Sequence, residues 1–359
     1  MAIEPIDLDL IKRLSEADGI GGCEREVSRI VKAYGQGLVD EYTYDNLGSL
    51  ILHKKGKGPK VMLSAHMDEV GFMVRQITPE GYLKLLPVGG WWGHVMPIHE
   101  MRVTTQAGDK YIGIIGSRAP HGMPLDEKNK VVAPIDFYLD MGVKDQAAIE
   151  ALGIQIGDMV TPHTSCQPLN DPAYLAGKAF DDRICVGVGL EVLRNISREI
   201  IDADVYFAAT VQEEVGIRGA RTAVHTIKPD VAIALDVTTA QDTPFDQGGL
   251  RLGDGCVLSM LDALTLANRG LLTKMEEIIE TEKLAVHYDF MTVGGTDACN
   301  IHKAMDGVVA MTLSIPTRYM HSPRLIIHQE DYRQTITLLT EFVRQLNSND
   351  VLAFKQALR

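Results

Sequence analysis

The sequence predicts an α/β protein in which a mixed, largely parallel sheet is flanked by helices and interrupted by an inserted β-rich domain. Three short apolar runs, at 60–65, 205–209 and 231–235, are typical of buried parallel strands, and each leads toward acidic or imidazole side chains. Segments with helical spacing of apolar residues lie among these runs. Between residues 71 and 164, by contrast, short β-like runs alternate with Gly and Pro turns. Together these observations predict a helix-flanked sheet and an insertion.

Length, composition and charge limit the classes of protein that fit. The chain has 359 residues, of which 45% are hydrophobic and 23% charged. That length is large for one core, so a single domain with an insertion, or two domains, is expected. The formal net charge of −13 argues against nucleic-acid binding, because phosphate contacts need a basic face.

The sequence contains no feature that predicts secretion or a membrane span. Residues 1–5 lack a basic region followed by an apolar run, and no apolar segment approaches the roughly 18 residues of a membrane-spanning helix. The cysteines are scattered, without a CxxC pair: Cys23, Cys166, Cys185, Cys256 and Cys299. This pattern is typical of a reduced protein, and we expect a cytoplasmic location.

The first 70 residues are expected to form helices and then strands. The helices are Asp7–Ala17 and Glu24–Leu38, and the strands are Ser49–His53 and Lys60–Ala65. The second strand leads into His66 and Asp68, which lie on the same side of an extended chain because they are two residues apart. Such a pair suits a histidine ligand whose ring is oriented by a carboxylate, although it is also common as a structural hydrogen bond.

The inserted β-rich domain is predicted to span residues 71–165, leaving a discontinuous α/β domain of residues 1–70 and 166–359. Its expected elements are the strands Phe72–Ile77, Tyr82–Leu86, Met101–Thr105 and Tyr111–Ile115 and the helix Asp145–Leu152. Their alternation with turns favours a small barrel or sandwich. The histidines of this segment are given no role.

The α/β pattern resumes at Gly177. The expected helices are Ile184–Ile196, Ala220–Thr226, Leu271–Lys283 and Glu330–Leu346, the last closing the chain, and the further strands are Val231–Leu235 and Val308–Ile315. The loop from Thr238 to Gly249 is long and irregular, as substrate-facing loops often are. The turn Gly294–Asp297 could hold a substrate group with its backbone amides, or it could be a tight turn capped by Asp297.

Two pairs of adjacent carboxylates stand at the edges of these elements. Asp181 and Asp182 begin the helix at Ile184, where a carboxylate is expected as a helix cap, but capping explains one of them, not both. Glu213 and Glu214 follow the buried strand in DVYFAATVQEEVGIRGA. Adjacent residues leave a strand in opposite directions, so one glutamate could bind a metal while the other moves protons. The alternative for this pair is a solvated acidic turn.

Taken together, these positions match a dinuclear metal site. The candidate residues are His66, Asp68, Asp181, Asp182, Glu213, Glu214, Asp236 and His321. Mixed histidine and carboxylate ligands suit Zn²⁺ or Co²⁺, with Mn²⁺ a further candidate. Two such ions sharing one water make a strong nucleophile at neutral pH.

Six segments, in the order SAHMDEVGF, GKAFDDR, VQEEVGIRGA, LDV, GGTDA and RYMHSP, span Ser64 to Pro323. In sequence and order they resemble the TET family of dinuclear metallo-aminopeptidases, which includes glutamyl and deblocking aminopeptidases. The resemblance implies a zinc exopeptidase-like catalytic domain interrupted by a β-barrel-like dimerisation domain. It also implies removal of amino-terminal residues from peptides by a metal-activated water.

The resemblance further implies a role for each matching residue. His66 and Asp236 would bind one metal, Glu214 and His321 the other, and Asp181 would bridge the two ions. Glu213 would be the general base, and Asp68 would orient His66. The partners implied are peptide substrates and further copies of the chain, as a tetrahedral dodecamer built from dimers, without nucleic acid or membrane.

Other functions remain open from the sequence. A related co-catalytic zinc deacylase or carboxypeptidase shares the sheet and the ligand types. A glycosidase needs two suitably spaced carboxyl groups, and the two histidines would then have no purpose. A non-catalytic scaffold with a decayed site is a more distant alternative. The preferred amino-terminal residue and the physiological metal are also left open.

Overall fold

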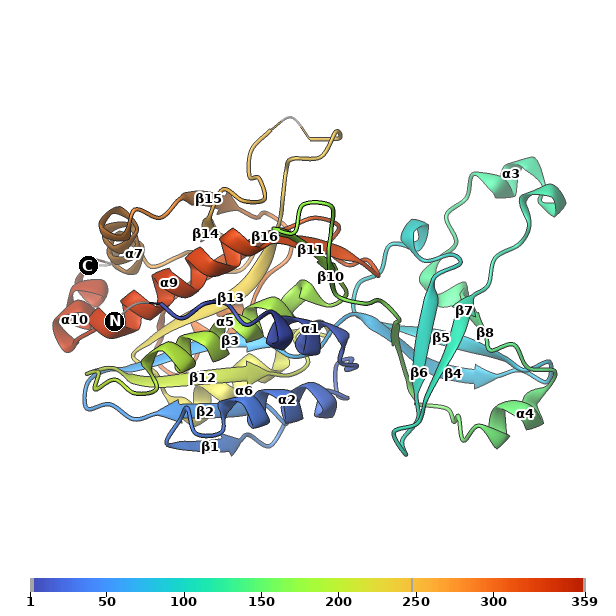
Figure 1. Ribbon diagram of the computed structural model, residues 1–359, viewed down its shortest axis with the longest axis horizontal. Coiled ribbons are helices and arrows are strands. Elements are labelled where there is room, and N and C mark those ends of the chain that lie inside the picture. The colour runs from blue at the N-terminus through green and yellow to red at the C-terminus, as the bar shows by residue number, and fades with distance from the viewer. Residues whose placement is uncertain (1–2, 247, 358–359) are drawn as a thin grey trace.

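The computed structural model describes residues 3–246 and 248–357, and Figure 1 shows that they form two lobes. The larger lobe is an eight-stranded sheet with helices on both faces, and the smaller lobe is built on a closed six-stranded barrel. A small third sheet joins β10 (Gln167–Pro168), β11 (Tyr174–Gly177) and β17 (Leu325–His328). This architecture confirms the predicted fold class.

The large sheet is mixed, with a parallel centre. Its strands, in order across the sheet, are β1 (Glu41–Tyr44), β2 (Leu50–Lys54), β12 (Asp204–Thr210), β3 (Lys60–His66), β13 (Val231–Thr239), β16 (Val309–Thr317), β14 (Cys256–Leu261) and β15 (Val286–Phe290). The four central strands β12, β3, β13 and β16 pair in parallel, whereas β1 and β2, and β14 with β16, pair antiparallel. Parallel pairing brings the carboxyl ends of the central strands to one edge of the sheet.

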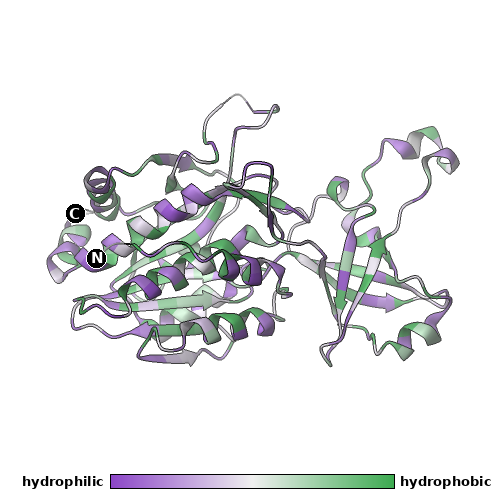
Figure 2. Cartoon of the chain, viewed as in Figure 1, coloured by the Kyte–Doolittle hydropathy of each residue, from purple (hydrophilic) through white to green (hydrophobic). Residues whose placement is uncertain are grey.

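Helices cover both faces of this sheet. One face is packed by α1 (Leu8–Glu16), α2 (Arg25–Gly35), α5 (Phe180–Ile196), α7 (Arg269–Glu282), α9 (Gln329–Gln345) and α10 (Ser348–Gln356), and the other by α6 (Arg218–Ile227) and α8 (Ala298–Ile301). Because both faces are covered, β3 and β13 are buried along almost their whole length. Their continuous apolar sequences reflect this position, and Figure 2 shows the hydrophobic colour along the central strands.

The smaller lobe lies within the predicted insertion. The barrel strands, in order, are β4 (Gly71–Ile77), β5 (Tyr82–Val88), β8 (Tyr138–Asp140), β7 (Lys110–Ile115), β6 (Glu100–Thr104) and β9 (Met159–Pro162), and β9 pairs with β4 to close the barrel. The helical segments are η1 (Gly93–Val95), η2 (Pro120–Gly122), α3 (Leu125–Lys128), η3 (Pro134–Asp136) and α4 (Gln146–Ala151). The barrel has its own apolar core, separate from that of the sheet. In Figure 1 the segment with α3 projects away from the barrel.

Two sequence expectations about the α/β lobe are wrong in detail. The helix expected at Glu330–Leu346 is α9, but it does not close the chain, because α10 follows it. Asn347 and Asp350 form a capping box that starts this last helix. The strand expected to end at Leu235 continues as β13 to Thr239, so Asp236 lies inside a strand and not at its end.

Several strands were not predicted, chiefly β14 and β15 at one edge of the sheet. β15 has the sequence VHYDF and contains only half-buried and exposed residues, so it lacks the continuous apolar run that marks the central strands. β10, β11 and β17 are two to four residues long, which is too short for a periodic pattern to be recognised.

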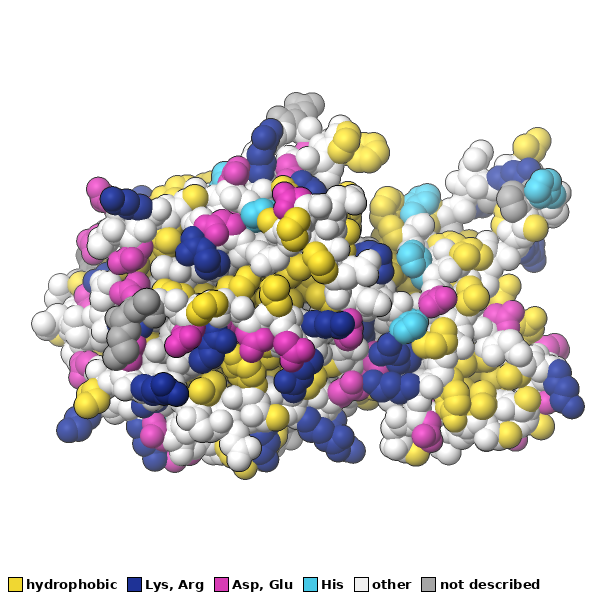
Figure 3. Space-filling view, viewed as in Figure 1, with side chains coloured by type: hydrophobic (Ala, Val, Ile, Leu, Met, Phe, Trp, Pro, Cys, Tyr) yellow, Lys and Arg dark blue, Asp and Glu magenta, His cyan; other side chains and the backbone are white. Residues whose placement is uncertain are grey.

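The surface carries charges of both signs. On the face shown in Figure 3, acidic and basic side chains are interspersed over both lobes. This distribution is expected if most of the 48 acidic residues of the sequence are solvated surface groups. Among the described residues, no helix combines the length and apolar character that a bilayer crossing requires.

Candidate metal centre

The predicted site residues come together at the edge where the central parallel strands end. His66 is the last residue of β3, and Asp236 lies in the neighbouring β13. Asp181 and Asp182 are at the start of α5, and the loops after β12 and β16 carry the remaining residues, Glu213, Glu214 and His321. Sequence segments far apart in the chain are joined here because parallel strands deliver their carboxyl ends to one place.

Asp181 lies between the two histidines. Its Oδ1 atom is 3.3 Å from Nε2 of His66, and its Oδ2 atom is 3.3 Å from Nε2 of His321. The side chain of Asp181 is 10% exposed and that of His66 is 2% exposed, so water screens these groups weakly. One carboxylate thus faces two imidazole nitrogens, one with each oxygen.

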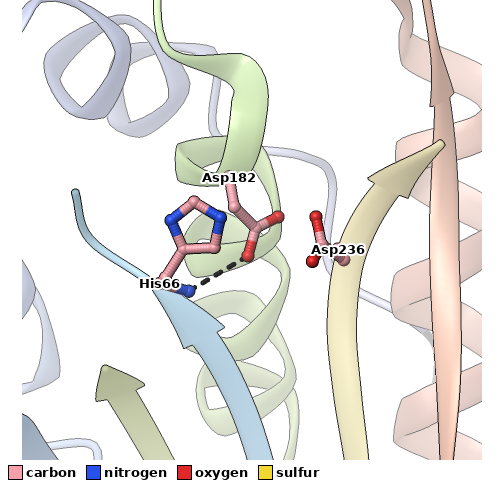
Figure 4. Close-up of side chains that lie close together, drawn as sticks. All are labelled: His66, Asp182 and Asp236. Carbon is pink, nitrogen blue, oxygen red and sulfur yellow. Dashed lines mark hydrogen bonds between the residues drawn. The ribbon is translucent and has the colours of Figure 1, made fainter. Parts of the chain in front are cut away.

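Asp182 and Asp236 also lie close to His66. Figure 4 shows the three side chains converging from α5, β13 and β3, and the backbone N–H of His66 donates to Oδ2 of Asp182 at 3.1 Å. Potential ligand atoms of these three residues lie within 4.8 Å of one another, and the same holds for His66, Asp181 and Glu214. A capping role for one of the paired aspartates is not found: both have non-helical backbone angles in the first turn of α5, and Oδ2 of Asp182 accepts from His66 instead.

Both histidine rings are held by backbone carbonyls. Nδ1 of His66 is 3.0 Å from the backbone oxygen of Asp68, and Nδ1 of His321 is 2.8 Å from that of Gly90. With Nδ1 donating to these carbonyls, Nε2 of each ring is the nitrogen that faces the acidic residues and that a metal ion could take. The Asp68 carboxylate is 3.6 Å from the His66 ring, so residue 68 holds this ring more closely through its main chain than through its side chain.

The Asp68 carboxylate holds the two adjacent glutamates. It accepts hydrogen bonds from the backbone N–H groups of Glu213 at 3.0 Å and Glu214 at 3.1 Å, one with each oxygen. These glutamates lie beyond the end of β12 at Thr210, in a loop and turn. Strand alternation therefore does not set their directions, as the sequence had suggested; contacts from another segment do.

Glu213 and Glu214 face different histidines. Oε2 of Glu213 is 4.0 Å from Nε2 of His66, whereas Oε2 of Glu214 is 3.6 Å from Nε2 of His321. The side chains are 10% and 6% exposed, which excludes the solvated acidic turn. The pair is therefore arranged for two separate contacts.

Without a cation, the site holds more negative charge than its histidines neutralise. Burial and the charge of Asp181 raise the pKa of Glu214 to about 8. The same two causes raise the pKa of Asp236 to about 8. Burial also raises the pKa of Glu213 well above its ordinary value. For His321 burial acts to lower the pKa, but the Asp181 carboxylate outweighs it and raises the pKa to about 9.

Asp181 behaves in the opposite way. Burial acts to raise its pKa, but hydrogen bonding to His321 and His66 holds the pKa well below its ordinary value. Asp181 is therefore the carboxylate of the site that stays ionised most easily, whereas Glu214 and Asp236 keep protons near neutral pH unless a positive charge replaces them.

The donor set fits a divalent cation. Oε1 of Glu214 and Oδ1 of Asp182 are buried and have no hydrogen-bond partner among the described residues. Buried carboxylate oxygens are costly when unpaired, and a bound cation supplies the missing charge and contact. Imidazole nitrogens beside carboxylate oxygens are the donor types that Zn²⁺, Co²⁺ and Mn²⁺ accept.

Sequence reasoning gave no role to Asp182 beyond a possible cap and left Asp297 as a possible turn cap. Asp297 makes no side-chain cap to α8. Its carboxylate is 2% exposed and accepts a hydrogen bond from Oγ1 of Thr210 at 2.7 Å, at the end of β12. The signal that could have marked both residues is an acid beside an apolar segment that is buried on all sides, because such acids need a specific partner.

Comparison with known proteins places these residues in a wider context. The model of a family described as M42 glutamyl aminopeptidase matches residues 48–338. The lysyl aminopeptidase of Pyrococcus furiosus is 33% identical over 352 residues, covering 96% of this chain and 99% of the relative. The glutamyl aminopeptidase of Lactococcus lactis is 31% identical over 351 residues, covering 97% of this chain and 98% of the relative.

Solved structures agree with these sequence relatives. A TET aminopeptidase from a marine sediment archaeon, Thaumarchaeota archaeon SCGC AB-539-E09, superposes with a TM-score of 0.94 at 35% identity, covering 97% of this chain and 98% of the other. The Pyrococcus horikoshii TET1 peptidase, which can assemble into a tetrahedron or a large octahedral shell, has a TM-score of 0.86 at 27% identity, with 94% and 99% covered. A TET1 structure is also known as a dodecamer, with a TM-score of 0.85 at 26% identity, covering 95% of this chain and 100% of that one.

Proposed function

The chain belongs to the M42 glutamyl aminopeptidase family and is a metallo-aminopeptidase, and we propose that it works with two divalent ions per chain. His66 and Asp236 would hold one ion, Glu214 and His321 would hold the other, and Asp181 would contact both. The ions proposed are Zn²⁺ or Co²⁺, with Mn²⁺ as a further candidate, because the ligands combine imidazole with carboxylate.

One observation supports the two-ion arrangement above the others. The two oxygens of Asp181 are each 3.3 Å from Nε2 of a different histidine. A carboxylate placed in this way can share its oxygens between two neighbouring cations, and its low pKa keeps it ionised for that purpose. A single-ion site would leave one of the two imidazoles without a use.

The chain's own residues divide the reaction between them. When bound, the ions supply an acidified water and polarise the carbonyl of the first peptide bond. Glu213, which is not assigned to either ion, would serve as the general base, accepting a proton and passing it to the leaving amine. Asp68 holds Glu213 and Glu214 through their backbone N–H groups, so the base and the ligand keep their separate directions.

The test is a metal titration followed by an assay. Protein freed of metal by chelation should be inactive on free-amine aminoacyl p-nitroanilides, and Co²⁺ should restore activity up to two ions per chain. N-acetylated substrates should not be cut, since an aminopeptidase requires a free amino terminus. Leucyl, lysyl and glutamyl substrates belong in the panel, because relatives are named for lysyl and for glutamyl activity.

Three results would each remove part of the proposal. Full activity in metal-free protein would refute the metal mechanism. Saturation at one ion per chain would refute the bridging role of Asp181. Efficient cleavage of N-acyl amino acids, with no action on free-amine peptides, would favour the deacylase alternative.

We also propose a tetrahedral dodecamer built from dimers, with residues 71–165 as the dimerisation domain and residues 1–70 and 166–359 as the catalytic domain. The similarity to TET1, which is known as a dodecamer and as a tetrahedral or octahedral shell, supports a homo-oligomer. In such a shell, peptides would reach the sites while folded proteins would be excluded.

A further inference from the structure

Glu24 contacts the loop that carries the two glutamates. It precedes α2 and is 6% exposed. At this position a side-chain oxygen ordinarily accepts a hydrogen bond from the first turn of its own helix, but Glu24 makes no such bond. Its Oε1 atom accepts instead from the backbone N–H of Gln212 at 3.0 Å and of Gly22 at 2.8 Å. The carboxylate thus ties the segment before α2 to the loop after β12.

Local preferences alone do not give that loop its shape. Gln212 has φ of +58° and Ile217 has φ of +55°, a region that residues with a side chain seldom adopt and that a β-branched residue adopts least. These two residues flank Glu213 and Glu214. Such backbone angles persist when surrounding contacts hold them.

The contacts that hold the loop come from two carboxylates on other segments. The backbone N–H of Gln212 donates a hydrogen bond to Glu24, while those of Glu213 and Glu214 donate to Asp68. Three successive backbone donors are therefore fixed from outside the loop. Because Gln212 precedes the two glutamates directly, a change in its backbone angles would turn both side chains away from the histidines that they face.

We propose that Glu24 is a positioning residue for the reaction: by fixing Gln212, it sets the directions of Glu213 and Glu214. This inference rests on the proposed function, in which Glu213 is the base and Glu214 a metal ligand. Glu24 is not assigned any contact with substrate or metal, and it acts through the backbone of the loop.

The experiment compares Glu24→Ala with Glu24→Gln. Alanine removes the acceptor, and kcat should fall by about 10²-fold, a loss that displacing a catalytic group by about 1 Å can cause, while KM changes little. Glutamine keeps an oxygen that can accept both N–H groups, so it should restore kcat to near the wild-type value. In metal-free protein, hydrogen exchange in the segment 211–217 should be faster in Glu24→Ala than in wild type or Glu24→Gln.

The matched control is Glu191→Ala. Glu191 is a fully buried carboxylate that also accepts a backbone N–H, from Asp7 at 2.8 Å. It lies in α5 ten residues beyond Asp181, which is about 15 Å along the helix. Its loss should lower stability without changing kcat or the exchange of 211–217. If Glu24→Ala does not fold, Glu24→Leu removes the same acceptor while filling more of the space.

Either of two outcomes would overturn the inference: unchanged kcat and exchange in the acceptor-free variant, or a kcat in Glu24→Gln as low as in Glu24→Ala. The inference would also be wrong if Glu24→Ala and Glu191→Ala lost the same stability and showed the same fall in kcat. The proposed function is tested separately by Glu213→Gln. An inactive Glu213→Gln beside a fully active Glu24→Ala would refute the role of Glu24 alone, whereas an active Glu213→Gln would refute the assignment of the base.

Discussion

At the scale of single residues, two chemically identical side chains of the metal centre differ in their contacts. Glu213 and Glu214 are neighbours in the chain, but Glu213 faces His66 and Glu214 faces His321. Asp68 holds the backbone of both. The proposed division of labour, a base and a ligand, therefore follows from the fold of the loop and not from any difference in the side chains themselves.

Substituting each glutamate separately tests this division. Glu213→Gln keeps the size and hydrogen bonding of the side chain but cannot accept a proton, so turnover should fall roughly 10²–10⁴-fold, the usual worth of general base catalysis. Its metal content should stay close to two ions per chain. Glu214→Gln removes a charged ligand, so one site should lose affinity, and excess metal should recover part of the activity. Turnover and metal content are measured on both variants.

Glu80→Gln serves as the control, because Glu80 is exposed in the turn between β4 and β5. Its turnover and metal content should match those of wild type. The assignment is reversed if Glu213→Gln empties a metal site while Glu214→Gln keeps both ions but is inactive. If both variants stay active, the pair has no role in the reaction.

At the scale of elements, the barrel is tied to the α/β lobe through one buried carboxylate. Asp18 is fully buried, and three barrel strands reach it: Arg102 of β6 at 3.0 Å, Lys110 of β7 at 2.7 Å and Thr161 of β9 at 2.8 Å. Lys178, just before α5, contacts Oδ1 of Asp18 at 2.9 Å, the same oxygen that accepts from Thr161. Burial acts to raise the pKa of Asp18. The cations Lys178, Lys110 and Arg102 outweigh burial and hold this pKa well below its ordinary value of 3.8.

Asp18→Asn should therefore destabilise the protein in a pH-dependent way. Removing one partner from a buried ion network costs about 3–5 kcal/mol, and this loss should appear in urea unfolding at pH 7. The folded-state pKa lies below the unfolded value, so the carboxylate stabilises the fold above about pH 4 and loses that contribution as the pH falls further. The difference in the free energy of unfolding between wild type and Asp18→Asn should accordingly become smaller toward pH 3.

Asp9→Asn is the matched control, since Asp9 pairs with Arg13 on the surface at 3.9 Å and such pairs contribute about 0–1 kcal/mol. An Asp18→Asn penalty that is the same at pH 7 and pH 3 would contradict the ionic role of Asp18.

At the scale of the whole molecule, the two lobes have separate apolar cores. The larger lobe carries the residues of the metal centre, and the smaller lobe is a closed barrel. A self-contained insertion of this kind can serve assembly without altering the sheet that delivers the ligands. The proposed use of residues 71–165 in dimer contacts agrees with this division of the fold.

Light scattering at micromolar concentration should therefore show a particle twelve times the chain mass of 39.4 kDa, with dimers as the smaller species on dilution. Short peptides should be cut at their amino end, while a folded protein with a free amino terminus should be left intact, because a closed shell excludes it. The same protein unfolded and digested to peptides is the control substrate. A monomer as the sole species at that concentration would contradict the assembly.

The sequence by itself determined the helix-flanked sheet and the presence of a β-rich segment within it, and it singled out the acidic and histidine residues that are proposed to form the site. It could do so because these features leave local patterns: buried parallel strands need continuous apolar runs, and acids beside such runs stand out at Asp181, Glu213 and Asp236. The family motifs supplied the proposed roles of the residues. β15 and α10 left weaker patterns and were missed, and β14 was missed although its sequence CVLSML is apolar and mostly buried.

The tertiary structure alone decided how the acids are used. Asp181 lies between His66 and His321 only because α5 and two strand-end segments meet, and the N–H groups of residues 212–214 end on Glu24 and Asp68, which are distant in sequence. Hydrogen bonds and charge pairs of this kind depend on distances of about 3 Å between segments, which spacing along a single chain does not encode. Sequence therefore identifies the groups, and the packing of the chain assigns their contacts.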